Sequence, residues 1–293
     1  MVVQSALQCD QYYLVGHYLT LLNSLNQKID VCKAVAFVTY KEWGAYRTHS
    51  MVSILVGPVY FIVLYFIWTA VYGGAQTLNG IEYTQMIRYF GATALIGYLT
   101  MDFADWNLSM LIRTGKFLTF ALRPLNHRFF ALSQKIGHRT LGFIVEFIPC
   151  LLIFTLLFKI DMRPAHFGWT LLSLTLAFLM NFFVNYCIGM TSFWFTQSQG
   201  IRSVYSFVSS VFSGMLIPLV FFPAPLKIIQ FFLPFQYAVY VPAMVFLGNY
   251  SLGDINMSIP RITGIQALAV FAVFLLSEFM YKAAMKKFTA AGA

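Results

Sequence analysis

The apolar residues of this chain gather into long blocks that are separated by shorter polar stretches. A helix needs about 20 mainly apolar residues to cross the hydrocarbon core of a bilayer. Several blocks meet this length, and together they predict an all-α polytopic membrane protein with six spans, at about 51–72, 89–108, 139–158, 168–194, 203–222 and 263–283.

These predicted spans differ in strength. The first has no charged residue and ends in the aromatic cluster of Tyr65, Trp68 and Tyr72, which is typical of the membrane interface. The second is the weakest, because Asp102 and Asp105 follow a short charge-free run. The fourth lies in a stretch from Pro164 onwards that stays free of charge throughout the span.

The composition excludes a soluble protein. Of 293 residues, 59% are hydrophobic and 10% are charged, whereas soluble domains have about 25% charged residues. The four cysteines form no CxxC pair and have no histidine at metal-ligand spacing, which argues against disulfides and a zinc site. The first residues lack the pattern of a cleaved signal, so we expect 1–32 to be a cytoplasmic arm.

The formal net charge of +9 could indicate nucleic acid or membrane topology. Its distribution favours topology, because cytoplasmic flanks collect Lys and Arg. With both termini inside, most basic residues fall on the inner side, and the outer side holds only Arg88, Lys159, Arg163, Lys227 and Arg261. We therefore expect a multi-pass protein of the plasma (inner) membrane with cytoplasmic termini, and no nucleic-acid partner.

A segment before the first span is predicted to be an amphipathic helix. Within 33–48, one helical sector collects Ala36, Phe37, Tyr40, Trp43 and Gly44. Such a helix could lie in the membrane interface in contact with lipid. The alternative is a cytoplasmic extension of the first span.

The loop at 109–138 carries basic residues and no acid. Loops of this length seldom lack structure or function. Apolar residues such as Leu111, Phe117 and Phe129 predict amphipathic helices that are broken near Pro124, and the loop is typical of a docking surface for a cytoplasmic partner.

The outer stretch at 223–260 and the residues just before it are apolar but rich in proline, which interrupts helices. Broken helices at membrane depth need surrounding protein, because lipid cannot satisfy their backbone groups. We expect a re-entrant pair of short helices that enters from the outer face, with candidate gate residues Pro218, Pro223, Pro234, Phe235 and Pro242.

Two groups of motifs stand out in the chain. The loop has Gly115-Lys116 and then Leu122-Arg123-Pro124-Leu125-Asn126. The outer segment has Ser213-Gly214, Pro218, Phe222-Pro223, Leu233-Pro234-Phe235, Tyr240, Pro242 and Gly248. Together they resemble the permease subunits of type-2 ATP-binding cassette (ABC) exporters, in particular a bacterial branch. The resemblance runs from about Tyr40 to the last span and implies a type-2 transmembrane domain at 33–293; the first thirty residues depart from it.

The resemblance also implies an architecture and partners. An elbow helix, with candidate residues Tyr40, Trp43 and Arg47, would precede the spans, and 109–138 would be the coupling loop. Two permease chains, identical or sister, would pair, and two ATPase subunits would bind below them. The candidate contacts to these ATPases are Arg113, Lys116, Arg123 and Arg128, for which plain topological flanks are the alternative.

The chain has no G-x-x-x-x-G-K-[ST] phosphate loop, so we expect no ATPase activity of its own. ATP and magnesium would be bound by the partner subunit, and no cofactor or metal is expected here. The predicted function is export of a hydrophobic or amphipathic small molecule, with a cationic one as an option. A secondary transporter driven by an ion gradient is the alternative, but it predicts internal repeats that we do not find.

Ionisable groups within spans are costly, and they are usually paired or functional. Asp102, Asp105 and Glu146 could pair with Arg113, Arg139 or Arg47, or they could form an acidic entrance for a cationic substrate. In the fourth span, Asn181 and Asn185 lie one helical turn apart and could bond to another helix or line a substrate path.

Overall fold

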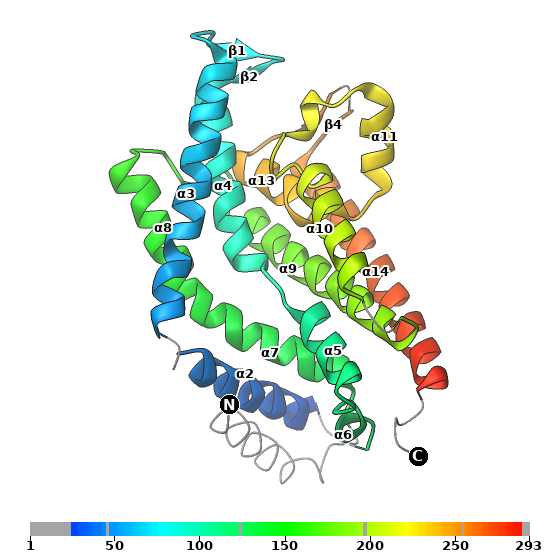
Figure 1. The fold of residues 1–293 in the computed structure, drawn as a ribbon. Coiled ribbons are helices and arrows are strands. Elements are labelled where there is room, and N and C mark those ends of the chain that lie inside the picture. The colour runs from blue at the N-terminus through cyan, green and yellow to red at the C-terminus, as the bar shows by residue number, and fades with distance from the viewer. Residues whose placement is uncertain (1–24, 45–46, 123–124, 196–197, 254, 289–293) are drawn as a thin grey trace.

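The computed structural model describes residues 25–44, 47–122, 125–195, 198–253 and 255–288 (Figure 1). Most of the predicted arm, and Arg123 of the coupling loop, lie outside these residues. The described chain is mainly helical, as the sequence predicts.

Four helical stretches are long and apolar enough to cross a membrane. They comprise α3 (Arg47–Tyr72), the continuous stretch that starts with α7 (His127–Gly142), α9 (Phe167–Met190) and α14 (Ile259–Lys287). After α7 the same stretch continues through two π-helical turns, η2 (Phe143–Phe147) and η3 (Ile153–Leu157), on either side of α8 (Ile148–Leu152). These helices contain the predicted first, third, fourth and last spans, but the third begins at His127 rather than near 139.

The prediction of one continuous helix at 89–108 is wrong. Helix α4 (Tyr83–Thr100) ends, and α5 (Ala104–Arg113) begins after a break at 101–103. At this break the side chain of Asp102 accepts a hydrogen bond of 2.9 Å from the backbone N–H of Ala104. An acidic side chain at this position satisfies a free N–H group of the new helix, so Asp102 starts α5 instead of lying inside a span.

The helix predicted at 203–222 is also shorter than expected. Helix α10 covers Gln199–Phe212, and the chain then turns at Gly214, whose φ is +83°. A side chain is strained at this φ, and a Cβ here would lie 2.7 Å from the hydroxyl of Tyr89. That hydroxyl donates to the carbonyl of Gly214 at 2.6 Å, so a buried contact ends the helical segment.

The outer segment forms short helices, as its prolines predict. Pro218, Pro223 and Pro234 stand immediately before η5 (Leu219–Phe221), α11 (Ala224–Phe232) and α12 (Phe235–Ala238), respectively. The next helix, α13 (Tyr240–Leu247), carries Pro242 in its first turn, where no helical N–H bond is lost.

Helix α13 is enclosed by the rest of the chain. Its residues 240–245 are buried, and it packs against α4 and α9 (Figure 1). Protein therefore surrounds α13, whereas α11 exposes Ile228, Ile229 and Phe232.

Two small hairpins were not predicted. They are β1 (Thr77–Leu78) with β2 (Ile81–Glu82), and β3 (Tyr250–Leu252) with β4 (Ile255–Met257). The first turns at Asn79-Gly80, and both residues have positive φ. An Asn-Gly pair is the usual signal for such a turn and could have revealed it.

The helix before the first span, α2 (Leu25–Gly44), lies against α7 and across the end of the bundle at which α5 ends (Figure 1). This end, which includes Arg113 and Lys116, is called the foot below. Its buried face contains Val31 and Val35, which form a small core with Phe120 and Phe130. The sector that was predicted to face the membrane interface contains Phe37, which is exposed. The buried face that carries Val35 packs against α7, a contact that a helical wheel does not include.

Helices α2 and α7 lie close together at Gly137. A Cβ there would lie 2.1 Å from the carbonyl oxygen of Ala36, which is backbone and cannot rotate away. We expect Gly137→Ala to separate the two helices and lower the thermal unfolding midpoint of the detergent-solubilised chain.

The matched control is Gly97→Ala in α4, because a Cβ there meets nothing within 4 Å. Alanine is better than glycine within a helix by about 0.5–1 kcal/mol, so this variant should be as stable as the parent or slightly more stable. Equal midpoints for Gly137→Ala and Gly97→Ala would contradict the close packing of α2 on α7.

Candidate functional site

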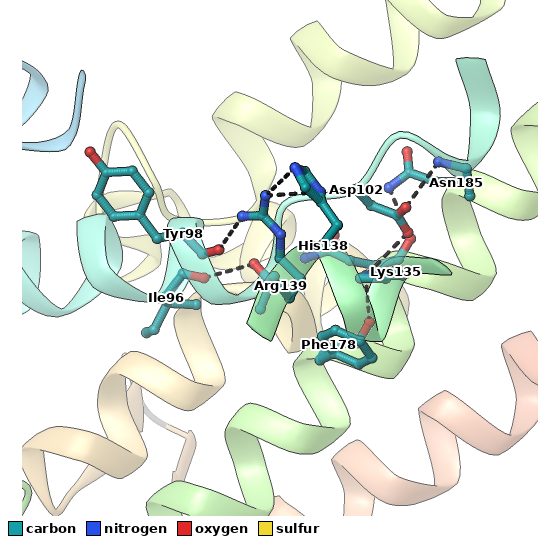
Figure 2. Close-up of polar contacts among 11 residues, drawn as sticks. Ile96, Tyr98, Asp102, Lys135, His138, Arg139, Phe178 and Asn185 are labelled. Carbon is teal, nitrogen blue, oxygen red and sulfur yellow. Dashed lines mark hydrogen bonds and ion pairs between the residues drawn. The ribbon is translucent and has the colours of Figure 1, made fainter. Parts of the chain in front are cut away.

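The break between α4 and α5 is held by a buried ion pair. The Lys135 ammonium on α7 lies 3.1 Å from the Asp102 carboxylate, and each side chain is only 3% exposed. Lys135 also donates to the carbonyl of Phe178 on α9 at 2.9 Å and lies over the ring of that residue (Figure 2). One side chain of α7 therefore joins the break to α9.

One helical turn further along α7, Arg139 makes a second set of contacts. Its guanidinium donates to the carbonyl of Tyr98 near the end of α4, and it lies beside the ring of His138 (Figure 2). It also pairs with Glu146 at 3.4 Å, in the π-helical turn η2. Since Arg139 is buried, these contacts hold the last turn of α4 against α7.

Two further ion pairs connect other helices. Asp105 on α5 accepts from Arg202 on α10 at 2.7 Å. Arg128 at the start of α7 pairs with Glu278 on α14 and donates to Ser277 at 2.9 Å. Together with the pairs of Lys135 and Arg139, they connect the break to α7, α5 to α10, and α7 to η2 and α14.

The sequence left pairing open as one role for the acidic residues, and the structure pairs all three. Arg139 was among the predicted partners and does pair with Glu146. The partners of Asp102 and Asp105 are instead Lys135 and Arg202. The sequence assigned Lys135 to the coupling loop, but it lies on α7, which begins at His127 and continues without interruption into the third predicted span.

A pocket of about 100 Å³ opens beside Arg139 and Glu146. Trp43 of α2 and Val56 of α3 form part of its wall, and Met101 lines it at the break. The ring of Trp43 lies 4.1 Å from the ring of His138. The pocket therefore lies where α2, α3, α7 and the break meet.

Asn181 and Asn185 of α9 are bonded to each other. Asn185 donates to the backbone carbonyl of Asn181 at 2.9 Å, a bond within one helix. Both side chains are partly buried. A role in a substrate path stays a prediction for them.

The predicted coupling residues occupy different surroundings. Arg113 ends α5 and Lys116 lies in the following turn, and both are exposed at the foot of the chain. Arg128 is mostly buried in its pair with Glu278, so it is less accessible to a partner than the other two.

The elbow candidates lie close to the same foot. Tyr40 is partly exposed on α2, Trp43 packs on His138, and Arg47 is the first residue of α3. Between Tyr40 and Trp43, burial raises the pKa of the Glu42 carboxyl. These positions support a joint between α2 and α3 at this end of the bundle.

One polar surface was missed by the sequence analysis. Along α10, polar residues recur at helical spacing and line an open hollow, namely Gln199, Arg202, Ser203, Ser206 and Ser210. The period of about 3.6 residues was visible in the sequence, but the apolar residues between them led to the prediction of a plain span.

Within the residues that the structure describes, no group of three His, Cys, Asp or Glu side chains is arranged to hold a metal ion. The polar groups of the site instead form ion pairs between helices.

Comparison with known proteins gives one family. The family model described as ABC-2 family transporter protein matches residues 59–292. No curated protein and no solved structure matches the chain.

The Lys135–Asp102 pair should be essential for stability. Removing one partner of a buried pair leaves an uncompensated charge and costs about 3–5 kcal/mol. We therefore expect Lys135→Met to lower the free energy of unfolding in mixed micelles by about this amount, and the double variant with Asp102→Asn to recover part of the loss.

Lys282→Met is the matched control, because Lys282 is 71% exposed and pairs with Glu278 one turn away. An exposed pair of this kind contributes about 1 kcal/mol or less. A loss for Lys135→Met no larger than that of the control would show that the buried pair does not hold the break.

Proposed function

The chain belongs to the ABC-2 transporter family, and we propose that it is the transmembrane subunit of an ATP-driven exporter for a hydrophobic or amphipathic small molecule. Members of this family are the membrane component of an ABC transporter and work with an ATPase subunit. The direction of transport, the substrate and the composition of the complex are parts of the proposal.

The observation that carries the proposal is the connection between the exposed foot and the long helices. Arg113 and Lys116 lie at the end of α5, and the same helix is tied to α10 through Asp105 and to α7 through the neighbouring Asp102. A displacement of the foot would therefore act on several spans together. This is what a transporter needs if ATP binding in a partner shifts the population between inward-facing and outward-open states.

The proposed complex contains two ATPase subunits and a second permease chain, either identical or a sister. ATP and magnesium bind to the ATPases. The chain crosses the inner membrane six times, with α4 and α10 as the shorter crossings, α2 as an interfacial elbow and both termini in the cytoplasm. The short helices that follow Pro218, Pro223 and Pro234, with Phe235 and Pro242, form the outer gate.

The ion pairs bear on the class of substrate. Asp102, Asp105 and Glu146 each lie beside a cation of the chain itself. An acidic entrance for a cation would have to displace these partners, so the geometry favours recognition by apolar and aromatic surface. We propose an amphipathic substrate without a required positive charge.

Co-purification tests the function. We expect a tagged chain to bring an ATPase subunit with it, and inverted membrane vesicles that contain both to accumulate amphipathic dyes only with ATP. The ion-gradient alternative predicts no ATPase partner and uptake that a proton or sodium ionophore abolishes. That second result would exclude an ABC exporter.

The exposed cations of the foot should transmit the action of the ATPase. We expect Arg113→Glu with Lys116→Glu to reduce ATP-dependent transport at least tenfold, because a reversed charge opposes contact with an acidic partner surface. Arg261→Glu is the control, since Arg261 is exposed in the first turn of α14, which is proposed to lie on the outer side. Equal transport by the foot variant and the control would remove these residues from the coupling surface.

Neutral and cationic substrates can be compared in Glu146→Gln and Asp102→Asn. If these acids are structural, each variant should reduce the transport of both substrate classes by the same factor. A selective loss of cationic substrates would instead identify an acidic entrance.

A further inference from the structure

The pocket beside the break presents two opposite charges next to each other. Arg139 and Glu146 both line it, and Trp43 lies in its wall. We propose that this pocket binds the headgroup of a zwitterionic phospholipid from the surrounding bilayer, with the lipid phosphate on Arg139 and the lipid ammonium near Glu146. The location at the inner membrane interface rests on the function proposed above.

Arg139 retains a donor that nothing in the described chain satisfies. Its terminal nitrogens contact the carbonyl of Tyr98, the ring of His138 and the carboxylate of Glu146. Its Nε is buried, and no hydrogen-bond acceptor for it is found among the described residues. Buried donors are nearly always bonded, and phosphate is a strong partner for a guanidinium.

The backbone around this ion pair is built to leave it room. Glu146 belongs to the π-helical turn η2, and such turns are frequent at functional sites. A Cβ on Gly142 would lie 2.9 Å from a carboxylate oxygen of Glu146 and 3.2 Å from Nη1 of Arg139. A glycine at this position therefore keeps space beside both charges.

The apolar wall suits the rest of a lipid. Val56 and Met101 line the pocket and are themselves 61% and 44% exposed. Together they give the pocket an apolar rim along which acyl chains could lie. Trp43 is typical of the level of lipid headgroups. A volume of about 100 Å³ suits a headgroup, so the acyl chains would stay outside the pocket.

The charges select the class of headgroup. An anionic headgroup would meet the carboxylate of Glu146, and a purely cationic one would meet Arg139. A headgroup with both a phosphate and an ammonium offers each residue an opposite charge. The nearby pair of Lys135 and Asp102 is neutral as a whole, so it favours neither sign.

Native mass spectrometry of the full chain, released from detergent, tests this site. The probes are phosphatidylethanolamine and phosphatidylglycerol with identical acyl chains. We expect the parent chain to retain phosphatidylethanolamine about tenfold more strongly, the effect of one charge-assisted contact. Gly142→Ala should abolish this preference by filling the space, and Glu146→Gln should abolish it by removing the partner of the ammonium.

Two control variants should leave retention unchanged. Gly97→Ala adds a methyl group elsewhere on a helix, and Glu278→Gln alters an ion pair that is not in the pocket. If Gly142→Ala does not fold, Trp43→Leu tests the wall of the same pocket and should also lower retention. Equal retention of the two lipids by the parent chain, or unchanged retention in Gly142→Ala or Trp43→Leu, would overturn the proposal.

The bound lipid must also be distinguished from transported cargo. In liposomes that contain the chain and its ATPase, we expect occupancy by phosphatidylethanolamine to persist during ATP turnover. Release of the lipid in step with turnover would overturn the resident site and identify the lipid as substrate. ATP-dependent export by a chain that retains no lipid would overturn the lipid site alone, whereas lipid retention without any ATPase partner would contradict only the proposed function.

Discussion

A carboxylate that is buried among apolar helices requires a cation, and at Asp102 this requirement shapes the centre of the molecule. The charge is compensated by Lys135, whose own ammonium is equally buried and also bonded to a carbonyl of α9. An unpaired charge in this environment is costly, and α7 supplies the cation because it runs past the break as a helix. The early start of α7, which the Asn126 side chain caps, therefore places Lys135 where the break needs it.

Backbone N–H and C=O groups that lack a helical partner impose a second constraint on the fold. Chain that is neither helical nor paired is tolerated at membrane depth only inside protein. In the outer segment, α13 meets this condition because α4 and α9 enclose it, and the Tyr89 hydroxyl donates to the carbonyl at the turn of Gly214. The same helix α4 therefore supports the irregular outer segment at one end and the break at the other.

Most of the fold could be predicted from the sequence, since the apolar length of a span and the positions of prolines are local properties. The long helices and the short outer ones follow from them. Contacts between distant residues could not be predicted in this way. The sequence assigns Lys135 to the coupling loop and does not show that α7 joins this part of the loop to the third span. It also does not show that Val35 packs against Phe120 and Phe130. Pairing was one of the two roles that the sequence left open for the acids, and only one of the three partners, Arg139, was identified.

The positions of Lys135 and Arg139 one turn apart on α7 have a mechanical consequence. Lys135 holds the carboxylate of the break, and Arg139 holds the carbonyl of Tyr98 just before it. The end of α4 and the start of α5 are therefore fixed to a single helix, and α5 cannot rotate about the break without loosening one of these contacts. Arg139 also lines the pocket with Glu146, so the face of α7 that holds the break is also a wall of the pocket. Any movement that separates the end of α4 from Arg139 would therefore change the shape of the pocket.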